Sequence, residues 1–412
     1  MRKLFTMIIA IASLQSTYAV VVTDTVSTGP QYANQVWYSL PNDEQGLSLK
    51  DNWDLAFEIS GYTSAIFANT QKGILVYQSP YPVSQWAVVD TLGIDGAAPL
   101  SNSESNWEEG ALNTNPDNDL DLGWGDYDMN THSVTGDSVY IIKLASGAWK
   151  KFKMNSLASS VYSFTWADLD GQNEQTGTVT KSGFTGKNFG YFSLENNTSV
   201  DREPVSADWD ITFTKYMTVI LAPEPTPYGV TGVVLNKGVS AIKASGVNVT
   251  TVDYNNYTFK SEINTIGWEW KTFAGTWTVE DSLAFFVKRT NGDIWKVIFT
   301  GFGGSSTGNY IFSKELVYEA STGINDIDGV SALTVYPNPA HNQVSVVYNY
   351  DKADLKNTGL TIYDMSGRLV LQQSFNMVNG FNQHIVDVSQ LNAGIYMVSI
   401  PGSSKTEKLI IQ

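Results

Sequence analysis

The apolar and polar positions between Val20 and Tyr318 are arranged in the manner of short β-strands. Apolar, β-branched and aromatic residues gather in runs of roughly four to eight, and clusters of Gly, Asn, Asp, Ser and Pro separate the runs. No stretch keeps helical spacing over several turns. The pattern therefore predicts an all-β body of hairpins and meanders. Representative runs are residues 73–78, 138–144, 228–235 and 283–288.

Three kinds of segment occur twice in this body, in the same order. The two Trp-Asp pairs, Trp53-Asp54 and Trp209-Asp210, are offset by 210 − 54 = 156 residues. Similar segments in the same order indicate a duplicated structural unit. Each Trp-Asp pair follows a run that ends in Ser-Leu and precedes a longer apolar segment. The matched segments are 37–40 with 191–194, 52–57 with 208–213, and 139–152 with 284–297.

The last of these matched segments are predicted to be β-hairpins. Their turns are centred on Ser146-Gly147 and Asn291-Gly292, and Asn-Gly between apolar runs is a strong hairpin signal because both residues accept positive φ. We predict two related β units, residues 20–178 and 179–322. A single large sheet domain with internal two-fold similarity is the alternative. Each Trp-Asp pair is interpreted as a buried ring beside a carboxylate that caps a turn.

The chain changes character after residue 322. Residues 323–332 carry Gly, Asn, Asp and Ser, which is the composition of a linker. Residues 333–412 form a compact run of alternating apolar and polar positions. We therefore predict a separate Ig-like β-sandwich at this end.

Residues 1–19 have the layout of a secretory signal peptide. Arg2 and Lys3 precede an apolar stretch from Leu4 to Leu14, and small residues lead to a cleavage site after Ala19. The stretch is too short to span a bilayer, and no later run of about 18 apolar residues follows. We predict a protein without a transmembrane segment that passes through the periplasm and is secreted or held on the outer-membrane cell surface.

Composition narrows the chemistry of the mature chain. A formal net charge of −16 opposes binding to nucleic acid or to anionic lipid. The lack of Cys excludes disulfides, thiolate metal sites and cysteine nucleophiles, and only three His remain. The sequence has no zinc-binding helix motif and no phosphate-binding loop. We predict a non-enzymatic protein without catalytic residues.

The C-terminal run carries four motifs in a fixed order: a Pro-Asn-Pro turn, a Gly-Arg hairpin turn, a Gly-x-Tyr strand start and a final basic strand. Together they resemble the type A sorting domain of the type IX secretion system. The resemblance implies that the translocon of that system recognises the domain and that its sorting-signal peptidase removes it. His341 and His384 lie within this module. The motif residues are Tyr336, Pro337, Asn338, Pro339, Gly367, Arg368, Gly394, Tyr396 and Lys408.

The Trp-Asp segments and the paired hairpins are similar to those of the HmuY family, all-β surface proteins of Bacteroidota whose best-known members bind haem. The resemblance implies a HmuY-like fold for both units and two axial ligands, His or Met, on loops after the Trp-Asp strand. The first unit offers His132 and Met129 there, and the second offers Met217. His132 and Met217 are therefore candidate ligands for haem or a porphyrin across the two units. A solvated His in a polar loop is the alternative.

A Gly-containing acidic loop carries carboxylates at alternate positions, which suit a hard cation such as calcium. The loop differs from an EF-hand, because its glycine comes one position late, an Asp replaces the final Glu, and no helices flank it. Calcium is the candidate metal, and a solvated acidic loop is the alternative. The candidate ligands are Asp117, Asp119, Asp121, Asp126 and Asp128.

Three classes of function remain open. The first is a surface binding protein for haem or a porphyrin, and the second is a calcium-stabilised carbohydrate-binding or adhesin-like surface module. The third is a structural surface-layer component without a small ligand. Tryptophans bear on the choice, because exposed rings stack on a sugar or porphyrin, whereas buried rings form sandwich core. They are Trp86, Trp107, Trp124, Trp268, Trp270 and Trp277.

Overall fold

The computed structural model describes residues 20–412 except 222–223, 321–328, 353–354, 366–367, 401–402 and 404. The described residues form antiparallel sheets with short helical segments only, which confirms the all-β prediction. The chain divides into two compact units, Met1–Glu319 and Ala320–Gln412. Among the described residues, no helix has the length and apolar character needed to cross a membrane. The predicted signal peptide, residues 1–19, lies outside the described residues.

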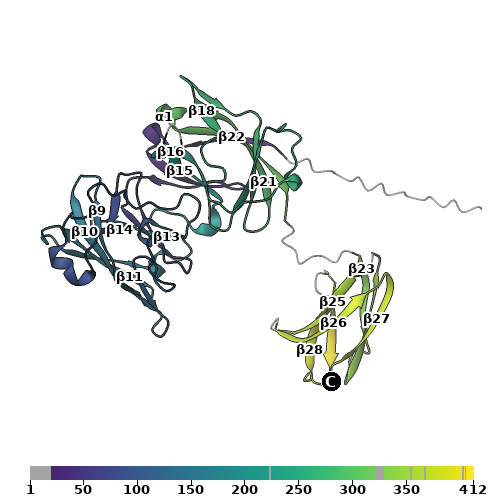
Figure 1. Ribbon diagram of the computed structural model, residues 1–412. Coiled ribbons are helices and arrows are strands. Elements are labelled where there is room, and N and C mark those ends of the chain that lie inside the picture. Colours follow the sequence, from purple (N-terminus) through teal and green to yellow (C-terminus); the bar gives the residue numbers. More distant parts are fainter. Residues whose placement is uncertain are drawn as a thin grey trace, which may run out of the picture. The chain divides into compact units, whose positions relative to one another are not determined.

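The first unit contains two β-sandwich lobes (Figure 1). One of them is a continuous segment, which we call the inserted lobe because the chain enters it from the other lobe and then returns. Its seven-stranded and four-stranded sheets share a core that includes Phe57, Tyr140 and Phe164. Its strands are β4 (Leu55–Glu58), β5 (Ile66–Ala68), β6 (Leu75–Gln78), β7 (Gly125–Asp128), β8 (Ser133–Gly136), β9 (Val139–Lys143), β10 (Trp149–Ala158), β11 (Val161–Asp168), β12 (Gln175–Thr180), β13 (Phe189–Ser193) and β14 (Thr198–Val200).

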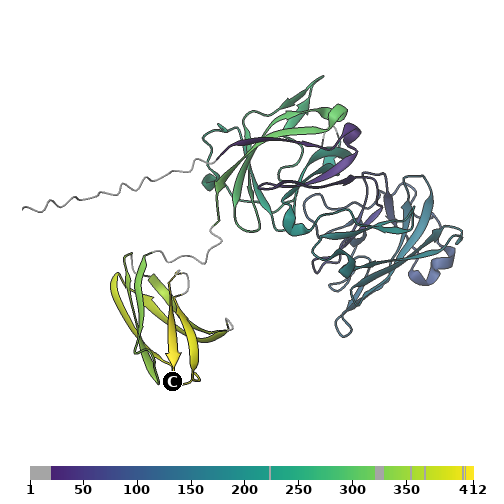
Figure 2. The same cartoon turned by 180° about the vertical axis from the view of Figure 1, so that it is seen from behind.

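The other lobe, the outer lobe, combines the N-terminal and C-terminal strands of the unit. Figures 1 and 2 show the purple N-terminal strands beside green strands from the far end of the segment. A five-stranded and a four-stranded sheet enclose a core that includes Val26, Tyr38 and Phe312. Its strands are β1 (Val22–Ser27), β2 (Asn34–Ser39), β3 (Asp43–Leu49), β15 (Ile211–Ile220), β16 (Thr226–Leu235), β17 (Ser240–Ser245), β20 (Leu283–Lys288), β21 (Ile294–Phe302) and β22 (Asn309–Tyr318), with the hairpin β18 (Lys271–Phe273) and β19 (Trp277–Val279).

Short helical segments close some of the loops and add no further layer. One is a single α-helical turn, α1 (Gly304–Thr307), and the others are 3-10 turns. The 3-10 turns are Pro30–Tyr32, Val83–Val88, Ala111–Asn113, Lys181–Phe184, Ser206–Asp208 and Tyr254–Asn256.

The two four-stranded sheets have the same topology, which shows how the duplicated segments pair. The strand order is β14-β13-β4-β5 in the inserted lobe and β3-β2-β15-β16 in the outer lobe. The register agrees as well, because Phe192 lies opposite Leu55 and Tyr38 lies opposite Ile211. Each Trp-Asp strand therefore pairs with the Ser-Leu strand of the other repeat.

This exchange corrects the predicted boundary between units 20–178 and 179–322. The boundary cuts through β12, which belongs to the inserted lobe together with β13 and β14. Strands β1–β3 pack instead with β15–β22 around a separate core. Sequence similarity marks equivalent strands but not the copy with which each strand pairs, so the predicted boundary followed the repeats and missed the exchange.

The buried aspartates of the Trp-Asp pairs hold the exchanged strands. Asp54 Oδ2 accepts the backbone N–H of Leu194 at 2.7 Å, and Asp210 Oδ2 accepts that of Leu40 at 2.8 Å. Both carboxylates are buried, and each cap lies just after the partner strand. This geometry is the turn-capping role interpreted from the sequence.

Each of these aspartates also forms an ion pair with one basic side chain. Lys72 Nζ lies 2.6 Å from Asp54 Oδ1, and Arg289 Nε lies 2.8 Å from Asp210 Oδ1. A buried carboxylate without such partners would be strongly destabilising, since removing one member of a buried ion pair costs about 3–5 kcal/mol. Each repeat thus supplies the backbone donors that the buried acid of the other repeat requires.

The second unit is an Ig-like β-sandwich. The sheets β23-β24-β27 and β26-β25-β28-β29 enclose a core that includes Val346, Ile362 and Val398. Strand β23 begins at Val330, inside the predicted linker 323–332, whose residues 323–328 lie outside the described residues. The strands are β23 (Val330–Tyr336), β24 (Gln343–Tyr350), β25 (Leu355–Asp364), β26 (Leu369–Met377), β27 (Gly380–Asp387), β28 (Gly394–Ser399) and β29 (Thr406–Ile411).

We expect the inserted lobe to fold without the rest of the chain and the outer lobe to need both of its segments. A fragment of residues 51–203 contains both sheets of the inserted lobe, so it should melt cooperatively when followed by circular dichroism. The fragment 204–319 lacks β1–β3 and should remain unfolded until a peptide of residues 20–50 is added. Cooperative unfolding of fragment 204–319 alone would contradict this expectation.

Candidate functional site

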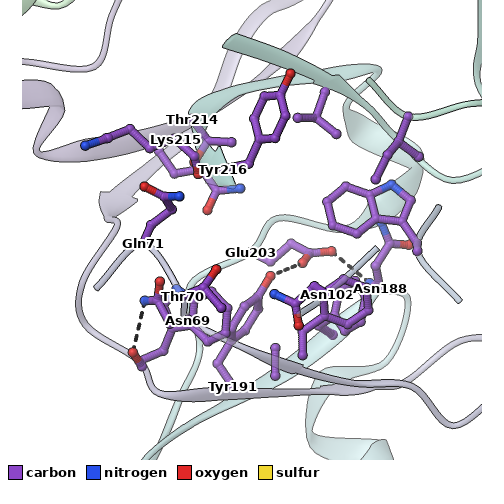
Figure 3. Close-up of a pocket in the computed structure, with 18 of the residues that line it drawn as sticks. Asn69, Thr70, Gln71, Asn102, Asn188, Tyr191, Glu203, Thr214, Lys215 and Tyr216 are labelled. Carbon is purple, nitrogen blue, oxygen red and sulfur yellow. Dashed lines mark hydrogen bonds between the residues drawn. The ribbon is translucent and has the colours of Figure 1, made fainter. Parts of the chain in front are cut away.

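A pocket lies between the two lobes of the first unit (Figure 3). Its cavity of about 130 Å³ is lined by both lobes and by the connection from β14 to β15. Aromatic rings and amides dominate the lining. In Figure 3, Gln71, Thr214, Lys215 and Tyr216 border one side of the open space, and Asn69, Thr70, Asn102, Asn188 and Tyr191 border the other.

Hydrogen bonds between the lobes fix the walls of this pocket. Trp107 of the inserted lobe donates its Nε1–H to the carbonyl of Leu235 in the outer lobe at 2.9 Å. Asn188 Nδ2 donates to Asn236 Oδ1 at 2.7 Å, and both of these side chains are buried. The pocket is therefore a built feature of the packed unit, in keeping with the largely pre-formed character of small-molecule sites.

Arg202 lies buried among three aromatic rings at the edge of the pocket. Its guanidinium carbon is 5.0 Å from the ring centre of Trp37, 5.8 Å from that of Trp53 and 5.0 Å from that of Tyr191. Cation–π attraction holds rings from both lobes around this one charge. The N–H groups of Arg202 donate to neutral oxygens, namely Asn52 Oδ1, Gln35 Oε1 and the Leu49 carbonyl.

Glu203, the next residue, is buried on the pocket wall. Its Oε2 accepts the Tyr191 hydroxyl at 2.6 Å, and its Oε1 accepts the backbone N–H of Asn188 at 2.8 Å (Figure 3). Burial raises the pKa of the Glu203 carboxyl to about 7, although these hydrogen bonds and Arg202 act in the opposite direction. The protonation of this carboxyl therefore changes near neutral pH.

Three buried polar atoms of the pocket lining have no hydrogen-bond partner among the described residues. They are Gln71 Nε2, Glu104 Oε2 and Trp209 Nε1. A buried polar atom left unpaired costs about 1–3 kcal/mol. Two of these atoms are donors and one is an acceptor, and hydroxyl groups can pair with atoms of both kinds.

The structure separates the predicted haem ligands. His132 is exposed on the turn between β7 and β8, where its Nδ1 lies 2.8 Å from the Tyr127 hydroxyl. Met129 is exposed on the same turn. Met217 on β15 lines the pocket, and no His is among the described residues that line it. The pair of His132 with Met217 is therefore not assembled in this pocket.

The predicted calcium loop brings two of its five carboxylates together with a third from outside the loop. Asp121, Asp126 and Asp137 each place a carboxylate oxygen within 4.8 Å of the others. Partial desolvation and the two neighbouring carboxylates raise the pKa of Asp137. Oxygen ligands of this kind suit calcium, which stays a prediction. The other predicted ligands, Asp117, Asp119 and Asp128, lie outside this group.

The first and last motifs of the C-terminal sandwich meet at its last strand. Asn338 Nδ2 donates to the Lys408 carbonyl at 2.6 Å, and Asn338 Oδ1 accepts the backbone N–H of Ile410 at 2.9 Å. Arg368 Nε lies 3.0 Å from Asp364 Oδ2. Tyr336, Pro337 and Pro339 flank Asn338, Gly394 and Tyr396 open β28, and Gly367 lies outside the described residues.

Sequence patterns identified few of the pocket residues. Met217 was predicted for another ligand, and Trp107 was considered for stacking on a sugar or porphyrin. Gln71, Glu104 and Arg202 are single polar residues in unrelated segments, so no motif connects them. The Trp-Asp repeat was the available signal, because Trp53 and Trp209 both line the pocket. Of the other candidate tryptophans, Trp124 and Trp270 are fully buried and Trp86 is partly buried. Trp268 and Trp277 line a second pocket.

Comparison with known proteins identifies the C-terminal sandwich. Residues 334–412 match the family model of the secretion system C-terminal sorting domain. The chain is therefore an all-β protein that type IX secretion exports to the cell surface or beyond it, as predicted.

No curated protein matches the chain. A crystal structure of dimeric latent PorU from Porphyromonas gingivalis aligns over 68% of this chain and 32% of that chain, with 14% identity and a TM-score of 0.17. The chain thus spans about a third of the length of that protein, and this superposition is too poor to relate their folds.

We expect Glu203 to make stability depend on pH between about 4.5 and 7. Because the folded state holds the proton more tightly than the unfolded state, the free energy of unfolding should fall as pH rises through this window. Glu203→Gln should remove about 1–3 kcal/mol of that fall. Urea unfolding of both proteins at several pH values measures the difference. Equal slopes for the two proteins would contradict the assignment.

We expect Asp137→Asn to raise the melting temperature at pH 7 in a chelating buffer. The substitution removes one of three crowded carboxylates, and a carboxyl with a raised pKa destabilises the fold as pH rises through that pKa. The gain should shrink as pH falls through the raised pKa of Asp137, because the carboxyl then takes up a proton and loses its charge. Calorimetry with and without calcium provides the measurement. A lower melting temperature of the variant in chelator would contradict the repulsion, and calcium stabilisation of the wild type alone would support the calcium prediction.

Proposed function

We propose that the mature body is a non-enzymatic binding protein whose pocket takes a sugar ring or a similar small polyhydroxylated molecule. The observation that carries the proposal is the set of unpartnered buried atoms on Gln71, Glu104 and Trp209. Sugar hydroxyls both donate and accept hydrogen bonds, so they complement the donors and the acceptor in this set. Aromatic rings such as Trp107 and Tyr216 add apolar faces for the carbon skeleton.

The carboxylates of the pocket favour binding over hydrolysis. Glycosidases commonly use two carboxyl groups that flank the scissile bond. Of the two acids in the lining, Glu203 already accepts hydrogen bonds on both oxygens. Glu104 is then left to face a ligand alone, which supports a role in recognition.

The haem function implied by the HmuY resemblance has less support. Met217 is the candidate axial ligand in the pocket, and His132 lies on an exposed turn outside it. The cavity of about 130 Å³ is also small beside the roughly 300–1,000 Å³ of typical pockets for drug-sized ligands. These features fit a single sugar ring better than a porphyrin.

We expect Glu104→Gln to weaken sugar binding about tenfold or more, because its Oε2 loses the charge that accepts a ligand hydroxyl. The matched control is Glu108→Gln on the same loop, which removes the same charge outside the pocket lining. A glycan array followed by isothermal titration of the chain 20–412 gives the affinities, and melting temperatures should not change. Equal affinities for the two variants would contradict the proposal.

A haemin titration of the same chain tests haem as the alternative ligand. We expect no saturable Soret shift at one equivalent. If a Soret shift occurs and Met217→Leu abolishes it, the ligand is haem and the sugar proposal is wrong.

A further inference from the structure

A second pocket lies on the outer lobe beside the first. Its cavity of about 360 Å³ opens along β16 and the hairpin β18–β19. Aromatic side chains form an exposed surface there: Tyr228 is 57% exposed, Phe273 is 60% exposed and Trp277 is 36% exposed. We call these three rings the aromatic shelf. Grouped exposed rings of this kind mark a binding surface.

The two pockets adjoin at the pair of strands β15 and β16. Lys215 lines both pockets, and it lies opposite Thr231, which lines the second. The side chain of Gln71, which lines the first pocket, lies close to Gly229, which lines the second. The approach is so close that a Cβ atom added to Gly229 would lie 2.7 Å from Gln71 Oε1. The two pockets therefore meet around Lys215 and Gly229.

Ring packing and a buried hydrogen bond hold the shelf in place. Trp277 packs against Phe302 with ring centres 4.9 Å apart, and Phe273 lies 5.1 Å from Trp277. Lys271, at the start of β18, donates through its Nζ to the carbonyl of Thr231 at 2.5 Å. These contacts tie the hairpin to β16, so the rings keep a fixed position relative to Lys215.

We infer that the ligand is an oligosaccharide, with one sugar in the first pocket and the following units along the aromatic shelf. This inference rests on the proposed function. The first pocket has room for one small ring, and the rings of the shelf stack on the C–H faces of sugars. Lys215 stands between the two regions, where its ammonium can donate to hydroxyl groups of the unit that joins them.

Ladders of oligosaccharides test the inference on the chain 20–412. The probes are glucose joined β-1,4, glucose joined α-1,4 and N-acetylglucosamine joined β-1,4, each from one to four units, measured by isothermal titration. We expect affinity in one ladder to rise about tenfold from one unit to four, because several rings stack at once. The variant Tyr228→Ala/Phe273→Ala should bind the single sugar as the wild type does and lose this rise. Both rings are more than half exposed, so the packed rings beneath remain.

The control is Tyr62→Ala, which removes a fully exposed ring outside both pockets and should keep the rise. Binding of the single sugar without a rise, or a rise that the double variant keeps, would overturn the inference and leave the proposed function standing. Failure of every ladder at every length would overturn both. A dimer in sedimentation experiments that the double variant abolishes would assign the shelf to a second copy of the chain and overturn the oligosaccharide.

Discussion

The body depends on two buried carboxylates that need partners from distant parts of the chain. Asp54 and Asp210 accept backbone N–H groups from Leu194 and Leu40, and each also meets a cation. A buried charge is tolerated only when it is paired and hydrogen-bonded. The strand that brings these donors must therefore lie beside the Trp-Asp strand. This requirement is the same in both lobes, and it gives the two four-stranded sheets their shared topology.

The pocket is a product of this pairing. Because each lobe contains strands from both repeats, the connection between β14 and β15 crosses from one lobe to the other, and it carries Arg202, Glu203 and Trp209 along the pocket. Arg202 gathers Trp37 of the outer lobe and Trp53 of the inserted lobe around one charge. The segment that joins the lobes thus also forms part of the pocket wall. The contacts that pack the lobes together therefore also shape the binding site.

The strands and the repeats could be predicted from the sequence, but the strand with which each one pairs could not. The spacing of the Trp-Asp pairs predicted equivalent strands and a capping role for Asp54, both of which agree with the structure. The exchange was missed, since apolar periodicity is the same whichever copy a strand joins. The C-terminal sandwich was predicted well because its motifs lie close together in the chain. The pocket was not, because Gln71, Glu104 and Glu203 become neighbours only through the packing of the lobes.

The outer lobe needs its last strand as well as its first strands, and the export signal comes after that last strand in the chain. Strand β1 is synthesised early, yet it pairs with β22, from Val22 with Lys314 to Ser27 with Asn309. Contacts this distant form late, and until then β1–β3 lack the partners that bury them. The sorting domain, residues 334–412, follows β22 along the chain. A chain cut short before β22 therefore lacks both the strand that completes the lobe and the signal that sends it out. Only chains that already contain β22, and with it every strand of the outer lobe, also carry the sorting domain.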